Sequence, residues 1–591
     1  METIIQKIEE ELNKVIKKLN IENVKANVQF SARPELADFQ TNVAFSLAKS
    51  LGKKPLEVAE LIANEIKVNG VDVTVVPPAY INFSLNSVGK NSLAEKLLTE
   101  DNYGIDNIGK GKTVVVDYGG ANIAKELHMG HLRSPIIGEA IVRLHRLFGY
   151  NTIGDVHFGD WGLQMGLIMA ILDEQGDLDY YYGKSNVKPK ITLEFLNLNY
   201  PKASARSKVD PEFKTKAETF TLNLQLLKEP YYTIWKDIRA VSMEAIKRNY
   251  EKLNCSFNLW YGESDAQKYI EPAVQRFIDL GLTRESEGAL VVDVRQEGEH
   301  IPIPKKDPND PNEKQLYKNP MPPVIIKKHN GGELYATTDI ATIMQRVEDN
   351  KNLEKIIYVV DKRQSTHFTQ VFRACRLSHI APENLELVHV GYGTMNGKDG
   401  KPFKTRSGDT IKLEDIINMV TSKADEKLKS NGLNEAQKTA EEIGVGAMKF
   451  GDLSNEVTRD YVFDLDAFMS FEGKTGPYIQ YTAVRIKSLL NKAGGFKPEF
   501  NIETAEEKNI LIEILKLIDA LKNALQNYAP NLVCNAVYNL ASTYSTFYNN
   551  TRILSEPNET KRNSYLSISK LALKYIEKAC DTLAISIPDK M

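Results

Sequence analysis

Two histidines flank a glycine in the segment HMGH, and a lysine precedes them. His128 and His131 are three residues apart with Gly130 between them, and Lys125 stands three residues before His128. Placed at the N-terminus of a helix, whose free N–H groups attract phosphate, these side chains can donate hydrogen bonds to phosphate oxygens. Such donors stabilise a phosphorus that gains negative charge when it is attacked, and a glycine allows a nucleotide to approach the backbone. The cluster therefore favours a reaction at the α-phosphate of a nucleoside triphosphate. The alternatives are a metal site and two ordinary surface histidines.

A lysine-rich segment, GKDGKPFKTRSGDT, is the second candidate for chemistry. It occupies residues 397–410, after a predicted strand and before a predicted helix start at LEDII. We expect Lys401, Lys404 and Arg406 to close over a triphosphate. A solvated basic turn is the alternative.

Buried parallel strands are needed to position the histidines. The apolar run at 113–119 predicts one such strand, and residues 150–162 predict a second strand and a loop. A helix between them has one apolar face, formed by Leu132, Ile136, Ala140, Leu144 and Phe148. This βαβ unit places the histidines at the carboxyl edge of a parallel sheet, where open α/β sheets bind ligands. Residues 354–361 and 385–393 predict further strands.

The flanking regions follow other patterns. Residues 1–20 predict an amphipathic helix, 57–70 a helix that ends on Gly70, and 71–86 two short strands around a turn. Residues 175–235 break the α/β pattern with many lysines, which predicts an insertion that extends to about residue 255. From residue 452 onward the pattern is almost entirely helical.

The composition limits the class of protein. The 591 residues are 42% hydrophobic and carry a net charge of -3, which argues against an unselective nucleic-acid coat. The four cysteines are widely spaced and form no CxxC pair, so we expect neither a disulfide framework nor a cysteine-rich zinc site. The N-terminus lacks the apolar core of a signal peptide, and no run of about 20 apolar residues predicts a membrane span. We therefore expect a cytoplasmic protein with no membrane partner.

Taken together, the motifs resemble a known family. HMGH and FKTRSG resemble the HIGH and KMSKS signatures of class I aminoacyl-tRNA synthetases. NIAKELHMGHLRS, GDWGLQMG, LYATTDIA, SFEGKTGPYIQY and LAISIPDKM resemble arginyl-tRNA synthetases, in the same order along nearly the whole chain. The resemblance implies an α/β fold with three parts. They are an N-terminal α+β domain at 1–110, a Rossmann-type catalytic domain at 111–451, and a C-terminal all-α anticodon-binding domain at 452–591.

The resemblance also implies the site residues. ATP would contact His128, Gly130, His131 and, beside the adenosine, His367. Arginine would contact Asn122, Glu263, Tyr335, Asp339 and Gln364. The physical chemistry agrees, because a guanidinium is planar and always charged and needs carboxylate partners. Each acid taken alone is more often a helix cap or a surface residue.

Two departures from the family pattern affect the catalytic groups. Gly120 and Ala121 stand where the family usually has a serine and a proline, which puts a serine contact with the substrate in doubt. Thr405 stands where the second lysine of the later loop is expected. Lys125 occupies the position of an upstream lysine thought to replace it, so we expect Lys125 to act with Lys404 and Arg406 in catalysis.

The flanking domains are expected to bind tRNA. In the N-terminal domain, Phe39 and Gln40 are the candidates for contact with the tRNA elbow. In the helical domain, the candidates near the anticodon are Tyr478, Tyr481, Tyr548 and Met591. Single-stranded bases stack on aromatic side chains, although packing in the protein core is the alternative for each tyrosine.

The resemblance therefore implies the activity of an arginine–tRNA ligase. Its substrates would be L-arginine, ATP with Mg²⁺, and tRNA(Arg), and by family habit it would be a monomer that needs tRNA for the activation step. A cysteine-activating synthetase would need a zinc cluster that these cysteines do not supply, and a pantoate-activating enzyme would be much shorter. An inactive RNA-binding paralogue would be expected to have lost the histidines or the acidic pocket.

Overall fold

The fold is that of a computed structural model of the whole chain. The structure describes residues 3–21, 24–296, 299, 301–302, 317–318, 321–328, 335–397, 400, 411–430, 432 and 437–591. No helix among these residues is both long and apolar enough to cross a membrane.

The chain forms two compact units. One unit consists of Met1–Ile108, Ser470–Thr582 and Ile587–Met591, and the other of Gly109–Met469 and Leu583–Ser586. The predicted ATP and arginine residues all fall in the second, central unit. The N-terminal region and the C-terminal helices together form the first.

A four-stranded parallel sheet is the centre of the second unit. Its strands are β5 (Thr113–Tyr118), β6 (Asn151–Asp155), β12 (Leu353–Asp361) and β13 (Glu386–Tyr392), in the spatial order β13-β12-β5-β6. All six residues of β5 are buried, as expected of a strand covered on both faces. The four predicted strands and the predicted parallel sheet are confirmed.

Successive residues of β5 face opposite sides of this sheet and meet different helices. The hydroxyl of Tyr118 donates to Glu139 Oε2 at 2.7 Å, on helix α5 (Arg133–Leu147). The preceding residue, Asp117, instead accepts from Arg346 of α12 (Tyr335–Asp349) on the other face. Gly138 on α5 is required because a Cβ there would lie 2.2 Å from Cγ of Tyr118. The predicted apolar face of this helix is confirmed, because all five of its residues are buried.

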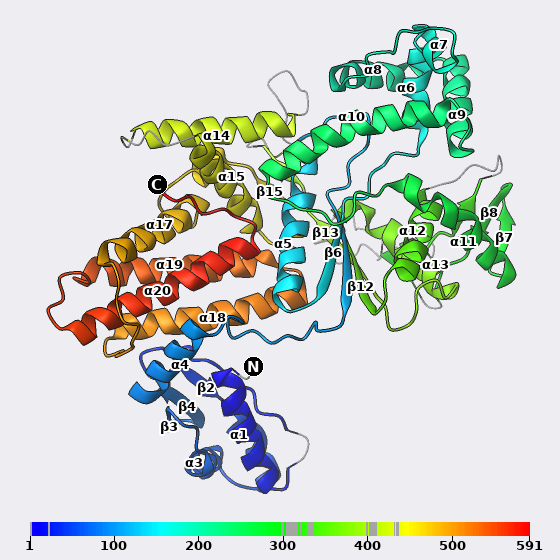
Figure 1. Cartoon of the computed structure of the whole chain (residues 1–591). Coiled ribbons are helices and arrows are strands. Elements are labelled where there is room, and N and C mark those ends of the chain that lie inside the picture. Colours follow the sequence, from blue (N-terminus) through cyan, green and yellow to red (C-terminus); the bar gives the residue numbers. More distant parts are fainter. Residues whose placement is uncertain are drawn as a thin grey trace, which may run out of the picture. The chain divides into compact units, whose positions relative to one another are not determined.

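The predicted insertion is helical (Figure 1). It contains α7 (Leu178–Tyr181), α8 (Leu193–Arg206), α9 (Pro211–Gln225) and α10 (Tyr231–Lys252). Helix α6 (Leu163–Glu174) directly precedes it. The other main elements of this unit are α11 (Gln267–Asp279), the sheet of β7 (Thr283–Ser286), β8 (Ala289–Val292) and β11 (Val324–Lys327), and helices α13 (Ser365–Leu377), α14 (Leu413–Ser430), α15 (Gln437–Leu453) and α16 (Leu465–Phe468). Four two-residue strands also belong to this unit: β9 (Ile301–Pro302), β10 (Tyr317–Lys318), β14 (Met395–Asn396) and β15 (Tyr461–Val462). Helix α14 begins at the predicted LEDII segment.

The N-terminal part of the first unit has the predicted α+β character. Its antiparallel sheet has the order β1-β2-β4-β3, formed by β1 (Gln29–Phe30), β2 (Phe39–Thr41), β3 (Val71–Val76) and β4 (Tyr80–Leu85). Its helices are α1 (Ile4–Lys18), α2 (Val43–Leu51), α3 (Pro55–Glu65) and α4 (Ser87–Thr99).

The predicted end of the helix expected at residues 57–70 was wrong. Helix α3 ends at Glu65 because Ile66 is already extended, with ψ 129°. Gly70 does not cap it. It has a positive φ of 79° in the turn before β3, and a Cβ there would lie 2.5 Å from Cα of Gly89. Close approach of two backbone segments therefore explains this glycine.

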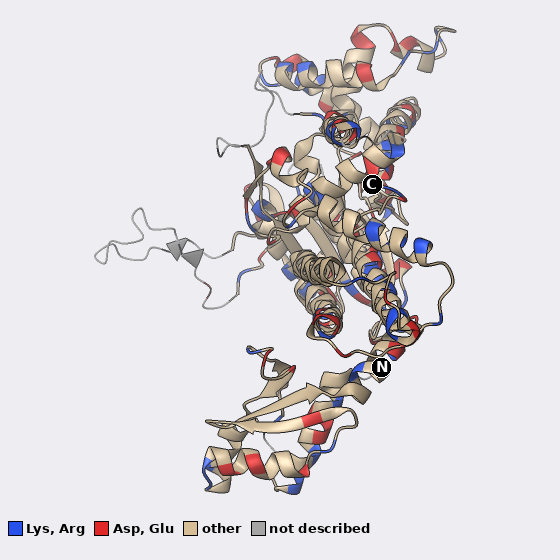
Figure 2. Cartoon of the chain, turned by 90° about the vertical axis from the view of Figure 1, so that its left-hand side faces the viewer, with Lys and Arg blue, Asp and Glu red and all other residues tan. Residues whose placement is uncertain are grey.

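The C-terminal part of the first unit is a bundle of long helices (Figure 1). They are α17 (Gly476–Ala493), α18 (Ala505–Asn527), α19 (Pro530–Asn550) and α20 (Glu559–Thr582). Lys574 of α20 donates to the carbonyls of Leu97 at 2.9 Å and Leu98 at 3.0 Å, at the end of α4. These bonds link the C-terminal helix α20 to α4 within the same unit. Figure 2 shows basic and acidic residues interspersed along the helices, which agrees with the near-neutral net charge.

Candidate active site

The predicted histidine pair forms a tight turn at the carboxyl edge of the parallel sheet. His128 caps a 3₁₀ helix, Met129–His131, which leads directly into α5. The backbone N–H of Gly130 donates to Nδ1 of His128 at 3.1 Å, and the backbone N–H of His128 donates to Nδ1 of His131 at 3.1 Å. Since Nδ1 accepts in both rings, the proton of each neutral imidazole lies on Nε2. Each ring therefore keeps one N–H donor for a ligand.

Both imidazoles are held neutral at physiological pH. Burial and the positive charge of Lys125 lower the pKa of His128 to about 4. Burial, His128 and Lys125 lower the pKa of His131 to about 3. The ring centroids lie 3.9 Å apart, so two charged rings would repel each other. Gly130 serves this packing as well, because a Cβ there would lie 2.8 Å from Cε1 of His128.

The end of the lysine-rich loop lies beside the histidines. The backbone N–H of Met129 donates to Ile411 O at 2.9 Å, and that of Leu413 donates to Leu127 O at 2.9 Å. This pairing fixes the position at which the loop returns to the fold. The predicted loop residues Lys401, Lys404, Thr405 and Arg406 lie outside the described residues.

Lys125 is exposed beside this pairing. It lines a pocket with Glu126, Arg248, Lys252 and Lys412 among its neighbours. Lys412 is paired with Glu126 at 2.7 Å, whereas no ion pair is recorded for Lys125 among the residues that the structure describes. Its ammonium group is thus available to an anionic ligand.

A group of acids forms the second part of the site. Glu263 begins a 3₁₀ helix, Glu263–Ala266, and its backbone N–H donates to Phe158 O at 2.9 Å, which attaches it to the loop after β6. Burial raises the pKa of Glu263 to about 8, and the carboxylates of Asp160 and Asp339 contribute to the rise. A carboxyl group in this state gains its charge when a cation arrives, because the cation offsets both the burial and the neighbouring acids.

Helix α12 supplies the other acid. Tyr335 is its first residue and is largely exposed, and Asp339 follows one turn later. Nε2 of His367, on α13, lies 2.5 Å from Oδ2 of Asp339. His367 was predicted beside the adenosine, but in the structure its ring contacts the predicted arginine-binding carboxylate. Gln364 is exposed just before α13.

Asn122 is held by the loop that follows β6. Its segment pairs with Gly159, since Ile123 N–H donates to Gly159 O and Gly159 N–H donates to Ala121 O, both at 3.0 Å. A Cβ on Gly159 would lie 2.2 Å from Oδ1 of Asn122. This contact explains why residue 159 is a glycine, for which the sequence alone offered no reason.

The sequence reasoning missed a supporting pair under Glu263. Asp160 is fully buried and accepts from the N–H of Ser264 at 3.0 Å and from its hydroxyl at 2.8 Å. Arg239 of α10, in the insertion, forms an ion pair with Asp160 at 3.0 Å. No local pattern revealed this pair, because its members are far apart in the sequence.

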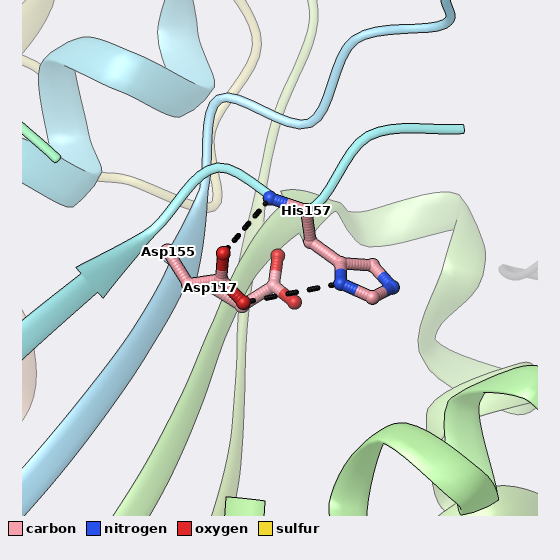
Figure 3. A group of neighbouring side chains, drawn as sticks. All are labelled: Asp117, Asp155 and His157. Atoms are coloured by element: carbon pink, nitrogen blue, oxygen red, sulfur yellow. Dashed lines mark hydrogen bonds and ion pairs between the residues drawn. The ribbon is translucent and has the colours of Figure 1, made fainter. Parts of the chain in front are cut away.

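A second missed group has the composition of a metal site. Asp117, Asp155 and His157 lie together at the ends of β5 and β6, with their ligand atoms within 4.8 Å of one another (Figure 3). However, Nη2 of Arg346 donates to Oδ2 of both aspartates at 2.7 Å. The guanidinium already supplies the positive charge that these carboxylates need and would repel a second cation, so the group does not fit a divalent metal ion.

In the first unit, the predicted tRNA-binding tyrosines gather around an arginine. Arg485 of α17 lies over the rings of Tyr548 at 4.5 Å and Tyr481 at 5.6 Å. The hydroxyl of Tyr478 contacts Ser545 Oγ at 3.1 Å, to which Arg485 also donates at 2.7 Å. None of these three tyrosines is fully buried, and Tyr481 is 41% exposed. The sequence reasoning missed Arg485, which joins the three rings in one cluster.

The remaining predicted tRNA residues differ in exposure. Met591 and Gln40 are partly exposed. Phe39, however, is fully buried in the N-terminal sheet, with its ring centroid 5.6 Å from that of Phe30. The prediction that Phe39 contacts tRNA was therefore wrong, because inward-facing residues of a strand form the core.

Comparison with known proteins identifies the family. The model of the class I (R) tRNA synthetase catalytic domain matches residues 93–465, that of the arginyl-tRNA synthetase N-terminal domain matches 2–85, and that of the DALR anticodon-binding domain matches 479–591. The chain is 40% identical over 619 residues to an arginine–tRNA ligase of Agathobacter rectalis and 38% identical over 606 residues to one of Alkaliphilus oremlandii, each over 100% of both chains.

Solved structures show the same fold. Arginyl-tRNA synthetase from Plasmodium falciparum matches with a TM-score of 0.80 at 23% identity, and that from Thermus thermophilus with 0.78 at 21%, each over 100% of both chains. The chain belongs to the class I arginyl-tRNA synthetase family.

Proposed function

We propose that the protein is an arginine–tRNA ligase, which forms arginyl-adenylate from L-arginine and ATP and transfers the arginine to the 3′ end of tRNA(Arg). One observation carries this proposal beyond family membership. A neutral pair of N–H donors, His128 and His131, occupies the same sheet edge as a carboxyl group, Glu263, whose pKa of about 8 prepares it for a cationic ligand. The first group suits a phosphate and the second suits arginine.

In the activation step, the carboxylate of arginine attacks the α-phosphate of ATP, which enters as its Mg²⁺ complex. The Nε2–H groups of His128 and His131 donate to phosphate oxygens as the five-coordinate state gains negative charge. Lys125 adds a full positive charge from the exposed side of the turn. We retain the prediction that Lys404 and Arg406 of the later loop contact the triphosphate, and Gly130 leaves room for the nucleotide. The bond between the α-phosphorus and the oxygen that bridges the α- and β-phosphates then breaks, and pyrophosphate leaves with that oxygen.

In the arginine pocket, Glu263 and Asp339 bind the guanidinium and ammonium groups of the substrate. Asn122 fixes the α-amino end, and Tyr335 and Gln364 complete the pocket. We infer that His367 orients Asp339 through its 2.5 Å contact, and we retain His367 as a candidate for contact with the adenosine.

The tRNA is bound by the flanking regions. We propose three domains: residues 1–110 for the elbow of the tRNA, 111–451 for catalysis with an insertion at about 175–255, and 452–591 for the anticodon. Gln40 is the N-terminal candidate. The C-terminal candidates are Tyr478, Tyr481, Tyr548 and Met591, with Arg485 now added. We further propose a cytoplasmic location, which the four free thiols support, and a monomeric state by family habit.

The test is exchange of labelled pyrophosphate into ATP. We expect exchange only when arginine and tRNA are both present, and its loss in His128→Ala and His131→Ala. An exposed histidine outside the site, as in His379→Ala, is the control. Failure of arginine to support exchange, with another amino acid active in its place, would refute the proposal.

A further inference from the structure

Arg346 is a buried side chain that the mechanism above does not use. It lies on the second half of α12 and is 4% exposed. Its Nη2 donates to Asp117 at the end of β5 and to Asp155 at the end of β6, both at 2.7 Å. One guanidinium nitrogen thus connects the helix to two adjacent strands of the central sheet.

The same helix carries the predicted arginine-binding acid. Asp339 and Arg346 are seven residues apart, which places them within about 20° of the same direction around an ideal helix. Thr337 fixes the first half of α12 from another side, because its hydroxyl donates to Ile326 O of β11 at 2.8 Å. The helix cannot slide or rotate without breaking one of these contacts.

Packed side chains connect Arg346 with the region around Asp339. The guanidinium lies 5.3 Å from the ring centroid of Tyr358, on β12, and the hydroxyl of Tyr358 is buried. The Tyr358 ring also packs on Phe368, with 4.8 Å between the ring centroids. Phe368 in turn lies 5.3 Å from the ring of His367, whose Nε2 is 2.5 Å from Oδ2 of Asp339. The clamp, defined as Arg346 with Asp117 and Asp155, therefore borders the arginine pocket rather than a remote part of the core.

We propose that Arg346 is a positioning residue for arginine recognition. The clamp fixes the register of α12 on β5 and β6 and so places Asp339 at the correct distance from Glu263. This inference rests on the proposed role of Asp339. It assigns no contact between Arg346 and the substrate. Asp117 and Asp155 resemble metal ligands, but the positive charge of the Arg346 guanidinium already neutralises them. They therefore hold α12 in place and do not bind a metal ion.

The test compares arginine and ATP binding by calorimetry in Arg346→Lys. A lysine keeps the charge, but its shorter chain cannot reach both carboxylates. A misplacement of ~1 Å in a functional group can reduce function by ~100-fold, so we expect the arginine Kd to rise by ~10–100-fold. The ATP Kd should stay within about twofold, since the histidine turn lies on another element.

A control separates positioning from general loss of stability. Leu428 of α14 is 2% exposed, and Leu428→Ala loosens the same unit away from α12. We expect Leu428→Ala to lower the melting temperature without the selective loss of arginine affinity. If it weakens arginine binding as much as Arg346→Lys does, or if Arg346→Lys weakens ATP equally or leaves arginine unchanged, the inference is wrong.

Two further variants complete the experiment. Should Arg346→Lys fail to fold, Asp155→Asn keeps an acceptor for Arg346 and removes one charge, and it should show the same selective loss to a smaller extent. A normal arginine Kd in a folded Asp155→Asn would then overturn the inference. Asp339→Asn tests the underlying assignment separately: if it leaves the arginine Kd unchanged, the proposed role of Asp339 fails, whatever the clamp variants show.

Discussion

Binding of arginine should release a proton from Glu263. Burial and two nearby acids raise the pKa of Glu263 to about 8, so the free site is mostly protonated near neutral pH. The bound cation favours the carboxylate, and binding must therefore remove the proton. At about pH 7 only roughly one site in eleven is ionised, which weakens the apparent affinity ~10-fold, or ~1.4 kcal/mol.

The sign of the pH dependence follows from this shift. Arginine affinity should rise with pH until the pH passes the pKa of Glu263, about 8, and then become constant. Proton release should approach ~0.9 per arginine near pH 7 and decrease toward zero at high pH. Calorimetric titration of arginine in buffers of different ionisation enthalpy measures both quantities.

Glu263→Gln should abolish the proton release and flatten the pH dependence. It should also weaken arginine binding above pH 8 by ~1.5–3 kcal/mol, because a charged hydrogen-bond acceptor is lost. The matched control is Glu348→Gln, which changes an exposed glutamate of α12. Arginine binding that is independent of pH and releases no proton would refute the account of this pocket.

Three other predictions concern the remaining parts of the site. Lys125→Ala should slow single-turnover arginine activation by ~10²–10³-fold, with kcat and kcat/KM falling together. A Thr405→Lys change in the Lys125→Ala background should recover part of the rate. A rise in the KM for ATP alone would show that Lys125 contacts ATP only in the ground state. Asp339→Asn should raise the arginine Kd far more than the ATP Kd. Citrulline should be rejected by at least ~1–3 kcal/mol, because it would leave the half-buried acids of the pocket unpaired. Comparable activation of citrulline would contradict the proposed pocket. Tyr481→Ala should weaken tRNA binding by ~1–3 kcal/mol without lowering the melting temperature, and unchanged affinity with lower stability would show a packing role.

Local pattern was sufficient for the elements that position the histidines. Strand β5 and the apolar face of α5 are each buried over their whole length, so the pattern of apolar residues predicted both elements correctly. The motif resemblance then named candidate site residues in the following loops, and the structure places His128, His131 and Glu263 beside the same edge of the sheet. It also predicted Glu263 and Asp339 as a pair of acids, which the structure places close enough to influence each other.

Contacts between distant residues were beyond the sequence reasoning. Arg346 lies 229 residues from Asp117 and 191 from Asp155, and nothing in the LYATTDIA segment indicates that its helix ends in a clamp. The prediction for Phe39 failed for a related reason, because two residues do not show which face of a short strand such as β2 is covered. The neutral state of the histidines likewise depends on burial, which the spacing of HMGH does not show.

The central claim is that this chain attaches arginine to tRNA. Its most direct test is aminoacylation of total tRNA by the purified protein with MgATP and each proteinogenic amino acid in turn, followed by identification of the charged tRNA. The account predicts an arginyl ester on tRNA(Arg) and no comparable charging with any other amino acid. Charging with a different amino acid, or no ester at all from a folded protein that binds tRNA, would contradict it.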